Sequence, residues 1–271
     1  MATPPSQTCV LVAKTYRLIQ RLGEGSFGKI FAARHKDTGE EFAVKLVPQI
    51  HTAIYANEVA IYEKIKDLKY VPSLYAAGTE GKYNYMVIDL LEQSVEQLKE
   101  AYGDRMQLKV VVHLGLQMLA LLESLHGKGI IHRDVKPANF LLKTNKHQVS
   151  EIYLIDFGLA GWEEAEKKGS ARLIGTHRYM SVNVQQCLAP AGRRDDLESL
   201  GYILLYLQLG ELPWQGTSES ESLARKQQLA FSAGAAGEFI LFIHYCRSLS
   251  LGAAPNYDYL RTLLSNLNKI I

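Results

Sequence analysis

The sequence has few cysteines and no pattern typical of export. Cys9, Cys187 and Cys246 are odd in number and far apart, so they fit neither a disulfide framework nor a zinc site and favour a reducing compartment. The N-terminus carries Pro4 and Pro5 but no apolar run after a basic start, which argues against a signal peptide. We find no stretch close to the roughly 20 apolar residues that span a bilayer. These absences predict a soluble intracellular protein.

The sequence also lacks an excess of charge of either sign. The formal net charge is +2 over 271 residues, so neither nucleic acid nor an anionic membrane is required as a partner. Hydrophobic residues make up 47% of the chain and charged residues 21%, an ordinary globular balance that argues against disorder. The length suits one large domain or two lobes that share a cleft.

The pattern of apolar residues changes near residue 91. Before it, after a short flexible lead at 1–15, the chain is strand-rich, with a hairpin signal at Asp37-Thr38-Gly39. We expect strands there at 29–34, 41–47, 73–78 and 83–89, and a single helix at 53–67. Beyond residue 91, apolar residues at spacings of three and four predict helices. These lie at 107–126, 196–209 and 238–249. The predicted fold is α+β, with a small antiparallel β lobe and a larger, mostly helical lobe.

A glycine-rich segment lies within the strand-rich part. Gly23 to Gly28 matches G-x-G-x-x-G, which alone is weak evidence because dinucleotide-binding domains carry the same pattern. A dinucleotide-binding loop opens into a helix, whereas residues 29–33 run into a hairpin. Between antiparallel strands, such a loop can close its backbone N–H groups over phosphates. A glycine-rich turn without a ligand is an equal alternative on this motif alone.

Two charged residues fall on positions expected to be buried. Alternation along 41–47 places Lys45 with Ala43 and Val47 on one strand face. Helical spacing places Glu58 on the apolar stripe of the next segment, where a carboxylate is costly unless it is paired. Lys45 is a candidate for that partner. The alternative is that Glu58 reaches solvent and Lys45 is a charge on an edge strand.

The segment from His132 to Asn139 carries H-R-D-x-x-x-x-N at full spacing. Asp134 can accept a hydroxyl proton while it aligns the nucleophile with a γ-phosphorus. Lys136 can neutralise charge on the transferring phosphoryl group. His132 is more often a brace for such a loop than a group that titrates in the mechanism.

Asn139 in this loop and Asp156 of the following Asp156-Phe157-Gly158 offer oxygen ligands for Mg²⁺, a hard cation that also bridges phosphate oxygens. The glycine loop, Lys45, Glu58 and both motifs occur in one order along the chain. Such a combination arises by chance in fewer than about one per cent of chains.

With these residues, the sequence resembles the eukaryotic protein kinases from about residue 16 to the end. It is most similar to the casein kinase 1 family, because Arg178–Asn183 stands where most kinases have Ala-Pro-Glu. Further segments match that family at 193–202, 212–216, 246–249 and 259–261. The resemblance implies a kinase domain at 16–271, with an N-lobe at about 16–88, a hinge at 89–91 and a C-lobe at 92–271.

The resemblance implies ATP and Mg²⁺ as cofactors, with Ile88 as gatekeeper, a hinge whose backbone bonds adenine, and Asp196 as a brace for the catalytic loop. Lys136 and Thr176 are similar to the serine/threonine pattern. The residues implied to bind ATP are Leu22, Gly23, Glu24, Gly25, Ser26, Phe27, Gly28, Lys29, Ile30, Ala43, Lys45, Ile88, Asp89, Leu91 and Leu141.

Members of this family often favour a phosphate or acidic group three residues before the target hydroxyl. Arg178 fits the family's pocket arginine, which can hold a phosphate in a bidentate manner. Of the family's second basic cluster, only Arg225 and Lys226 are present, and the segment at 162–164 is acidic where the family is basic. Solvated surface arginines are the alternative interpretation.

These observations predict an active serine/threonine kinase that acts on proteins as a monomer. We expect it in the cytoplasm, with the nucleus as a second candidate compartment, and without nucleic acid or membrane as partner. A pseudokinase scaffold is the alternative, but Lys45, Asp134 and Asp156 are all retained. A small-molecule kinase is disfavoured by Gly175-Thr176 and Arg178–Asn183, which hold a peptide in related proteins.

Overall fold

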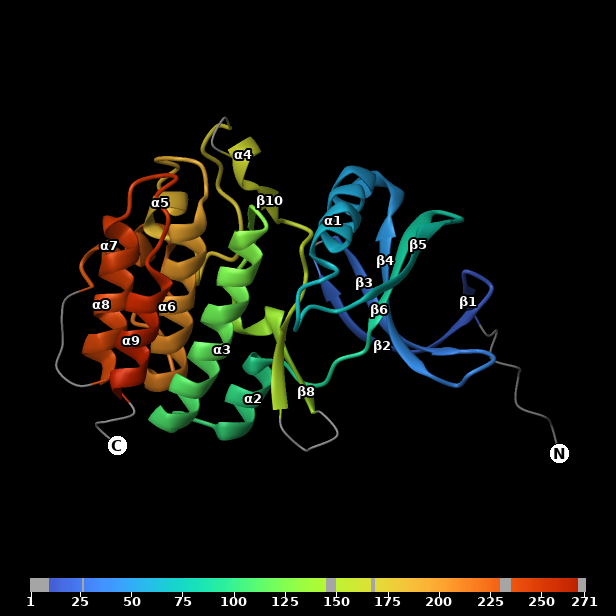
Figure 1. Ribbon diagram of the computed structural model, residues 1–271, viewed down its shortest axis with the longest axis horizontal. Helices are drawn as coiled ribbons and strands as arrows, with labels where there is room; N and C mark the ends of the chain where they lie inside the picture. The colour runs from blue at the N-terminus through green and yellow to red at the C-terminus, as the bar shows by residue number, and fades with distance from the viewer. Residues whose placement is uncertain (1–9, 26, 145–149, 167–168, 230–234, 268–271) are drawn as a thin grey trace. The chain divides into compact units, whose positions relative to one another are not determined.

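The computed structural model describes residues 10–25, 27–144, 150–166, 169–229 and 235–267. The chain divides into two compact units. The N-terminal unit comprises the chain up to Lys66 together with Pro72–Leu91, and the C-terminal unit comprises Asp67–Val71 together with the chain from Glu92 onward. Each unit has its own secondary structure, labelled in Figure 1.

The N-terminal unit is built on a six-stranded antiparallel sheet, in the order β1-β2-β3-β4-β6-β5. The strands are β1 (Leu11–Val12), β2 (Tyr16–Gly25), β3 (Gly28–His35), β4 (Glu41–Pro48), β5 (Leu74–Glu80) and β6 (Tyr83–Asp89). The 3-10 helix η1 (Gln49–His51) leads into α1 (Thr52–Ile65). The predicted strands and helix are therefore confirmed. The hairpin at Asp37–Gly39 joins β3 to β4, and Gly39 supplies the left-handed φ of +76° that such a turn uses.

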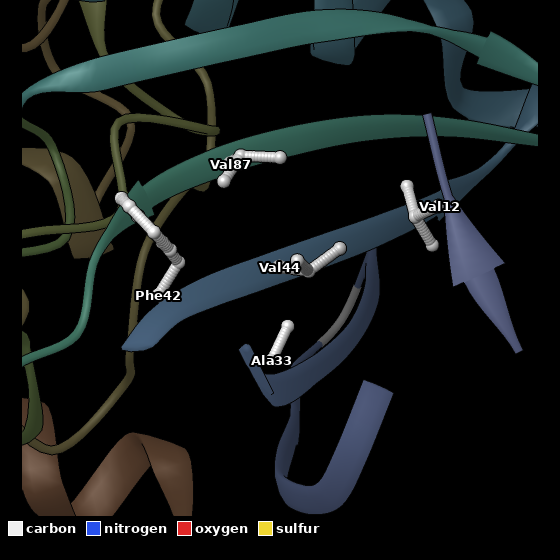
Figure 2. Packing of buried hydrophobic residues seen from close by; sticks show 5 residues of the cluster. All are labelled: Val12, Ala33, Phe42, Val44 and Val87. Carbon is white, nitrogen blue, oxygen red and sulfur yellow. The ribbon is translucent and has the colours of Figure 1, made fainter. Parts of the chain in front are cut away.

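One hydrophobic cluster of this unit lies on one face of the sheet. Val12, Ala33, Phe42, Val44 and Val87 pack together there, from four different strands, as Figure 2 shows. Because side chains alternate along a strand, the residues between these in β4 point to the opposite face. That face is covered by α1, which contacts β4, β5 and β6. β4 is thus buried on both faces.

The C-terminal unit is mainly helical. Its helices are α2 (Val95–Tyr102), α3 (Leu108–Gly127), η2 (Pro137–Asn139), α4 (Glu163–Glu166), α5 (Val182–Gln185), α6 (Arg193–Leu209), α7 (Glu219–Gln227), α8 (Ala235–Ser248) and α9 (Tyr257–Leu267). Two short antiparallel pairs lie among them, β7 (Ile130–Ile131) with β10 (Gly161–Trp162), and β8 (Phe140–Thr144) with β9 (Ser150–Leu154). The predicted α+β fold with a β-rich part and a helical part is confirmed.

Helix α6 begins three residues earlier than the apolar spacing predicted. Its first turn is charged, and the Asp195 carboxylate caps the helix by accepting the Gly192 backbone N–H at 2.8 Å. Capping of this kind satisfies an N–H group that has no partner inside the helix. From Asp195 to Leu207 every residue of α6 is buried, so α6 is the central helix of this unit.

Helix α3 packs closely against α6 and α9. A Cβ added at Gly115 would lie 2.7 Å from a methyl of Leu204 in α6 and 3.5 Å from Leu264 in α9. Among the described residues, α3 alone is long and apolar enough to span a membrane by length and composition, a helix that our search for long apolar stretches did not find. Because its apolar stripe is buried against α6 and α9, core packing explains that composition.

Candidate active site

The predicted pair of Lys45 and Glu58 is present in the N-terminal unit. The Lys45 ammonium donates to both carboxylate oxygens of Glu58, at 2.7 and 2.8 Å. Only 7% of Lys45 and 1% of Glu58 is exposed. β4 lies between β3 and β6 in the sheet, so Lys45 is not on an edge strand. A buried charge in such a position requires a partner, and α1 supplies it.

The glycine segment forms the end of the β2–β3 hairpin, where Gly25 pairs with Gly28. A Cβ at Gly28 would lie 2.3 Å from the Leu46 carbonyl oxygen of β4, so packing alone requires glycine there. A Cβ at Gly23 or Gly25 would meet nothing within 4 Å. Packing therefore gives no reason for glycine at these two positions. Ser26 lies outside the described residues.

The other residues implied to bind ATP lie on or beside the sheet strands and on β8. Ala43 is buried, whereas Ile30, Phe27, Ile88 and Leu91 are half-buried. The exposed ones are Leu22, Glu24, which forms an ion pair with Arg21, and Lys29. The Asp89 carboxylate accepts the Ser73 N–H at 2.7 Å and the Tyr75 hydroxyl at 3.2 Å. Leu141 is half-buried on β8 of the C-terminal unit.

Asp134 is the centre of a polar cluster in the C-terminal unit. Its Oδ2 accepts from the Lys136 ammonium at 2.6 Å, and its Oδ1 accepts from the Thr176 hydroxyl at 2.7 Å. Lys136 also donates to Thr176 at 3.1 Å. The Asn139 amide donates to the Asp134 backbone oxygen at 2.9 Å. Three residues named from the motif and one named only from the family resemblance, Thr176, are thus brought together.

The two residues predicted to bind Mg²⁺, Asn139 and Asp156, belong to two segments that a backbone hydrogen bond joins. Asn139 accepts the Ile155 N–H through its backbone oxygen at 3.0 Å, and Asp156 is the next residue. Because the Asn139 amide nitrogen is held by Asp134, its Oδ1 is left as an acceptor. One carboxylate and one amide oxygen suit Mg²⁺, which keeps several waters and phosphate oxygens as ligands. The donor set fits the predicted ion.

His132 braces the catalytic loop, as expected. Its Nε2 donates to the Ile155 backbone oxygen at 3.0 Å, while its Nδ1 accepts the Asp134 backbone N–H at 3.3 Å. The ring also packs edge-on against Phe157, with centroids 5.5 Å apart. Both ring nitrogens are therefore used in fixing the loop that carries Asp134 to the segment that carries Asp156.

Asp196 holds the same loop from α6, as the resemblance implied. It accepts the backbone N–H groups of His132 at 2.7 Å and Arg133 at 2.8 Å, and is bonded to His126 Nε2 at 2.9 Å. Burial alone would raise the pKa of this carboxyl, but the hydrogen bond and charge of His126 outweigh burial and hold the pKa below its usual range. Arg133 has a left-handed φ of +65°, and these bonds stabilise that conformation.

Sequence reasoning missed two members of this network. His126 is fully buried and its Nδ1 lies 2.7 Å from the Tyr257 hydroxyl of α9. His126 is a polar residue that helical spacing places on the apolar stripe of α3, and this break in the apolar pattern is the signal that could have identified it. Nothing in the local pattern pointed to Tyr257, because the contact joins residues 131 positions apart.

The surface beside Asp134 is hollowed into a pocket of about 370 Å³ within the C-terminal unit. Lys136 and Thr176 line it on the side of the catalytic cluster, and Glu96, Arg178 and Tyr179 line it elsewhere. A pocket next to a carboxylate held in one orientation is a suitable place for a substrate side chain. The arrangement can hold a hydroxyl group near Asp134 and place cations beside it.

The comparisons with known proteins agree with this geometry. The family model described as "Protein kinase domain" matches residues 16–243. The chain belongs to the protein kinase family. It is 35% identical to Casein kinase I homolog 1 of Schizosaccharomyces pombe over 276 residues, which cover 95% of this chain and 62% of that protein. The resemblance to the casein kinase 1 family is confirmed, and the chain spans less than two thirds of that relative.

The prediction that Lys226 contributes to a substrate phosphate pocket is wrong. Lys226 is completely buried, and its ammonium donates to three protein oxygens. Arg225 is exposed but forms an ion pair with Glu221 at 2.5 Å. Arg178 is half-buried and lines the pocket beside Asp134. Packing turns Lys226 inward, and the contribution of Arg178 and Arg225 to a phosphate pocket stays a prediction.

Proposed function

We propose that this protein is a serine/threonine protein kinase of casein kinase 1 type, which transfers the γ-phosphate of ATP to hydroxyl groups of proteins. The observation that carries the proposal is the cluster of Asp134, Lys136, Thr176 and Asn139 beside the pocket. A hydroxyl that enters the pocket past Lys136 and Thr176 lies close to a carboxylate, that of Asp134, able to accept its proton and align it. Family membership supports the same reaction.

Each remaining group has a proposed role. Lys136 neutralises charge on the transferring phosphoryl group, and Thr176 fixes the rotamer of Asp134 through its 2.7 Å hydrogen bond. Asn139 and Asp156 would hold Mg²⁺, which would supply positive charge to the phosphates when bound. In the N-terminal unit, Glu58 orients Lys45 toward the α- and β-phosphates.

The glycine hairpin is proposed to cover the phosphates. Gly23 and Gly25 have no packing need for glycine, and the close approach of a phosphate to the backbone would explain both. Gly28 has a structural reason of its own, since β4 passes too close for a side chain. Substitution of Gly25 by Ala should therefore raise the KM for ATP without a large loss of stability.

The decisive experiment compares the wild type with Asp134→Asn in ATP-dependent labelling of casein or an acidic peptide. The asparagine keeps the shape but not the basic carboxylate, so turnover should fall on the order of 10²–10⁴-fold. Asp104→Asn is the matched control, because its side chain is 89% exposed and belongs to no site. Equal labelling by wild type and Asp134→Asn would contradict the mechanism. ATP binding without labelling by the wild type would favour the pseudokinase alternative.

We further propose that acidic or pre-phosphorylated substrates are preferred, through Arg178. The guanidinium at the pocket can bind a phosphate in a bidentate manner. With Lys226 buried, this preference rests on Arg178, and Arg178→Gln should abolish it. Peptides that differ only by a phosphate three residues before the target provide the test. Equal kcat/KM for both peptides with the wild-type enzyme would refute the preference and leave the kinase activity unaffected.

A further inference from the structure

Lys226 is a buried, charged residue to which the proposed reaction gives no role. It lies in α7 with no exposed surface. The ammonium donates to the backbone oxygens of His177 and Met180 at 2.8 Å each, and to the Gln185 side-chain oxygen at 2.9 Å. An ammonium has three N–H bonds, so these acceptors use all of them. Lys226 therefore has no donor for a substrate phosphate.

The two carbonyl groups belong to one turn, Thr176–Met180. Within the turn, the Thr176 backbone oxygen accepts the N–H groups of Tyr179 and Met180. The Arg178 oxygen accepts the Trp214 indole N–H at 2.8 Å. The His177 and Met180 oxygens accept from Lys226. Because buried backbone oxygens require donors, one side chain satisfies two separate positions of this turn.

The same turn forms part of the proposed active site. Its first residue, Thr176, is bonded to Asp134 and Lys136, and Arg178 lines the pocket beside them. The preceding Gly175 has a φ of +99°, and a Cβ there would lie 2.4 Å from the Arg133 backbone oxygen. The start of the turn thus packs tightly against the catalytic loop. A shift of the backbone of the turn would move Thr176 and Arg178 together.

Within the described residues, no carboxylate forms an ion pair with Lys226. The nearby Glu198 accepts from the Arg247 guanidinium at 2.9 Å and from the Val182 N–H at 3.1 Å. Lys226 instead lies over the rings of Tyr202 and Trp214, 5.4 and 5.7 Å from their centroids. Carbonyl dipoles and aromatic faces are weaker partners than a carboxylate, but both favour a cation.

We propose that Lys226 is a positioning residue, whose buried ammonium fixes the Thr176–Met180 turn and so shapes the substrate pocket for phosphorylated and unphosphorylated proteins alike. The inference rests on the proposed kinase function. It assigns Lys226 a role in the affinity for every protein substrate, in place of the recognition of a phosphate.

The test compares Lys226→Met, which keeps the length of the side chain and removes its donors, with Gln227→Met, the exposed neighbour in the same helix. The expected result for Lys226→Met is an increase of about tenfold in the KM for both members of a phosphorylated and unphosphorylated peptide pair. The KM for ATP should stay within about twofold, as should all constants of Gln227→Met. Lys226→Arg, which retains donors, should recover part of the loss. Faster amide hydrogen exchange at 176–180 in Lys226→Met should accompany the change.

Two outcomes would overturn the proposal. A loss confined to the phosphorylated peptide would make Lys226 a phosphate ligand, and identical constants for Lys226→Met and Gln227→Met would leave it without a role. If Lys226→Met does not fold, Lys226→Gln keeps two amide donors, and its peptide KM decides in the same way. The proposed kinase function fails separately, when the wild type labels neither peptide.

Discussion

Two of the buried lysines in the described part of the chain, Lys45 and Lys226, are held in opposite ways. Lys45, on the central strand β4 of the N-terminal unit, bonds to a carboxylate. Lys226, on α7 of the C-terminal unit, bonds to two backbone oxygens, an amide oxygen and two aromatic rings. An ion pair fixes one partner, Glu58, whereas a set of neutral acceptors fixes a stretch of backbone. The first arrangement suits the orientation of a charge, and the second suits the shape of a turn.

The largest effect is expected from breaking the ion pair on one side. Lys45→Met leaves Glu58 buried without its cation, and such a loss costs about 3–5 kcal/mol of unfolding free energy. Lys226→Met leaves no buried carboxylate without a cation, because Glu198 keeps its ion pair with Arg247. It should cost about 1–3 kcal/mol, because one buried carbonyl group, that of Met180, loses its donor, while that of His177 is only partly buried. Urea unfolding of both variants measures the difference. Equal costs would contradict the distinction between the two sites.

Replacing both members of the ion pair separates stability from activity. Lys45→Met combined with Glu58→Leu removes both charges, so most of the stability lost in the single variant should return. Activity should stay about 10²–10³-fold below wild type, because no cation remains to stabilise the phosphates. Labelling rates and urea unfolding on the same preparations measure both. Recovery of activity in the double variant would show that Lys45 has only a structural role.

The difference between the two lysines also shows which features of the fold and the site could be predicted from the sequence. The Lys45–Glu58 pair was visible because both residues break a local pattern, strand alternation in one case and helical spacing in the other. The catalytic loop was visible because Asp134, Lys136 and Asn139 lie within six positions. The types of the predicted elements followed from the same periodicities, with errors of a few residues at ends such as that of α6, whereas α2, α7 and α9 were not predicted.

Burial of Lys226 could not be predicted, since it depends on a turn about fifty residues earlier in the chain. In the sequence Lys226 follows Arg225 in a polar segment, and a basic pair of this kind usually marks a solvated surface. Only the packing of the Thr176–Met180 turn over α7 and the rings of Tyr202 and Trp214 sends one member inward. Long-range contacts of this kind, like the one between His126 and Tyr257, leave no local signal.

The stability of the fold should depend on pH through Lys226. Burial lowers the pKa of Lys226 to about 7, with the charge of Glu198 opposing and that of Arg247 adding to the shift. The pKa is about 10.4 in an unfolded chain. Between these values the unfolded chain binds more protons, so the unfolding free energy of wild type should rise with pH relative to Lys226→Met. The slope is at most about 1.4 kcal/mol per pH unit.

Affinity should change in the opposite direction over the same interval. The ammonium form that holds the turn is lost as the pH rises above the folded pKa, so the peptide KM of wild type should increase while its stability increases. Urea unfolding and peptide kinetics at pH 7, 8 and 9 test both trends. A stability difference that is flat across this range would mean that the three hydrogen bonds keep Lys226 protonated.

The smallest effect is expected at Arg225, the residue beside Lys226 in α7. Its side chain is 47% exposed, and it pairs with Glu221 one helical turn earlier at 2.5 Å. Exposed pairs at this spacing contribute about 0.3–0.5 kcal/mol, and less at high salt. Arg225→Gln should therefore lower the unfolding free energy by no more than this, with no dependence on pH between 7 and 9. A larger or pH-dependent loss would mean that Arg225 shares the buried environment of Lys226. A small loss of unfolding free energy would show that Arg225 and Lys226, adjacent basic residues of one helix, differ in role because only Lys226 is buried.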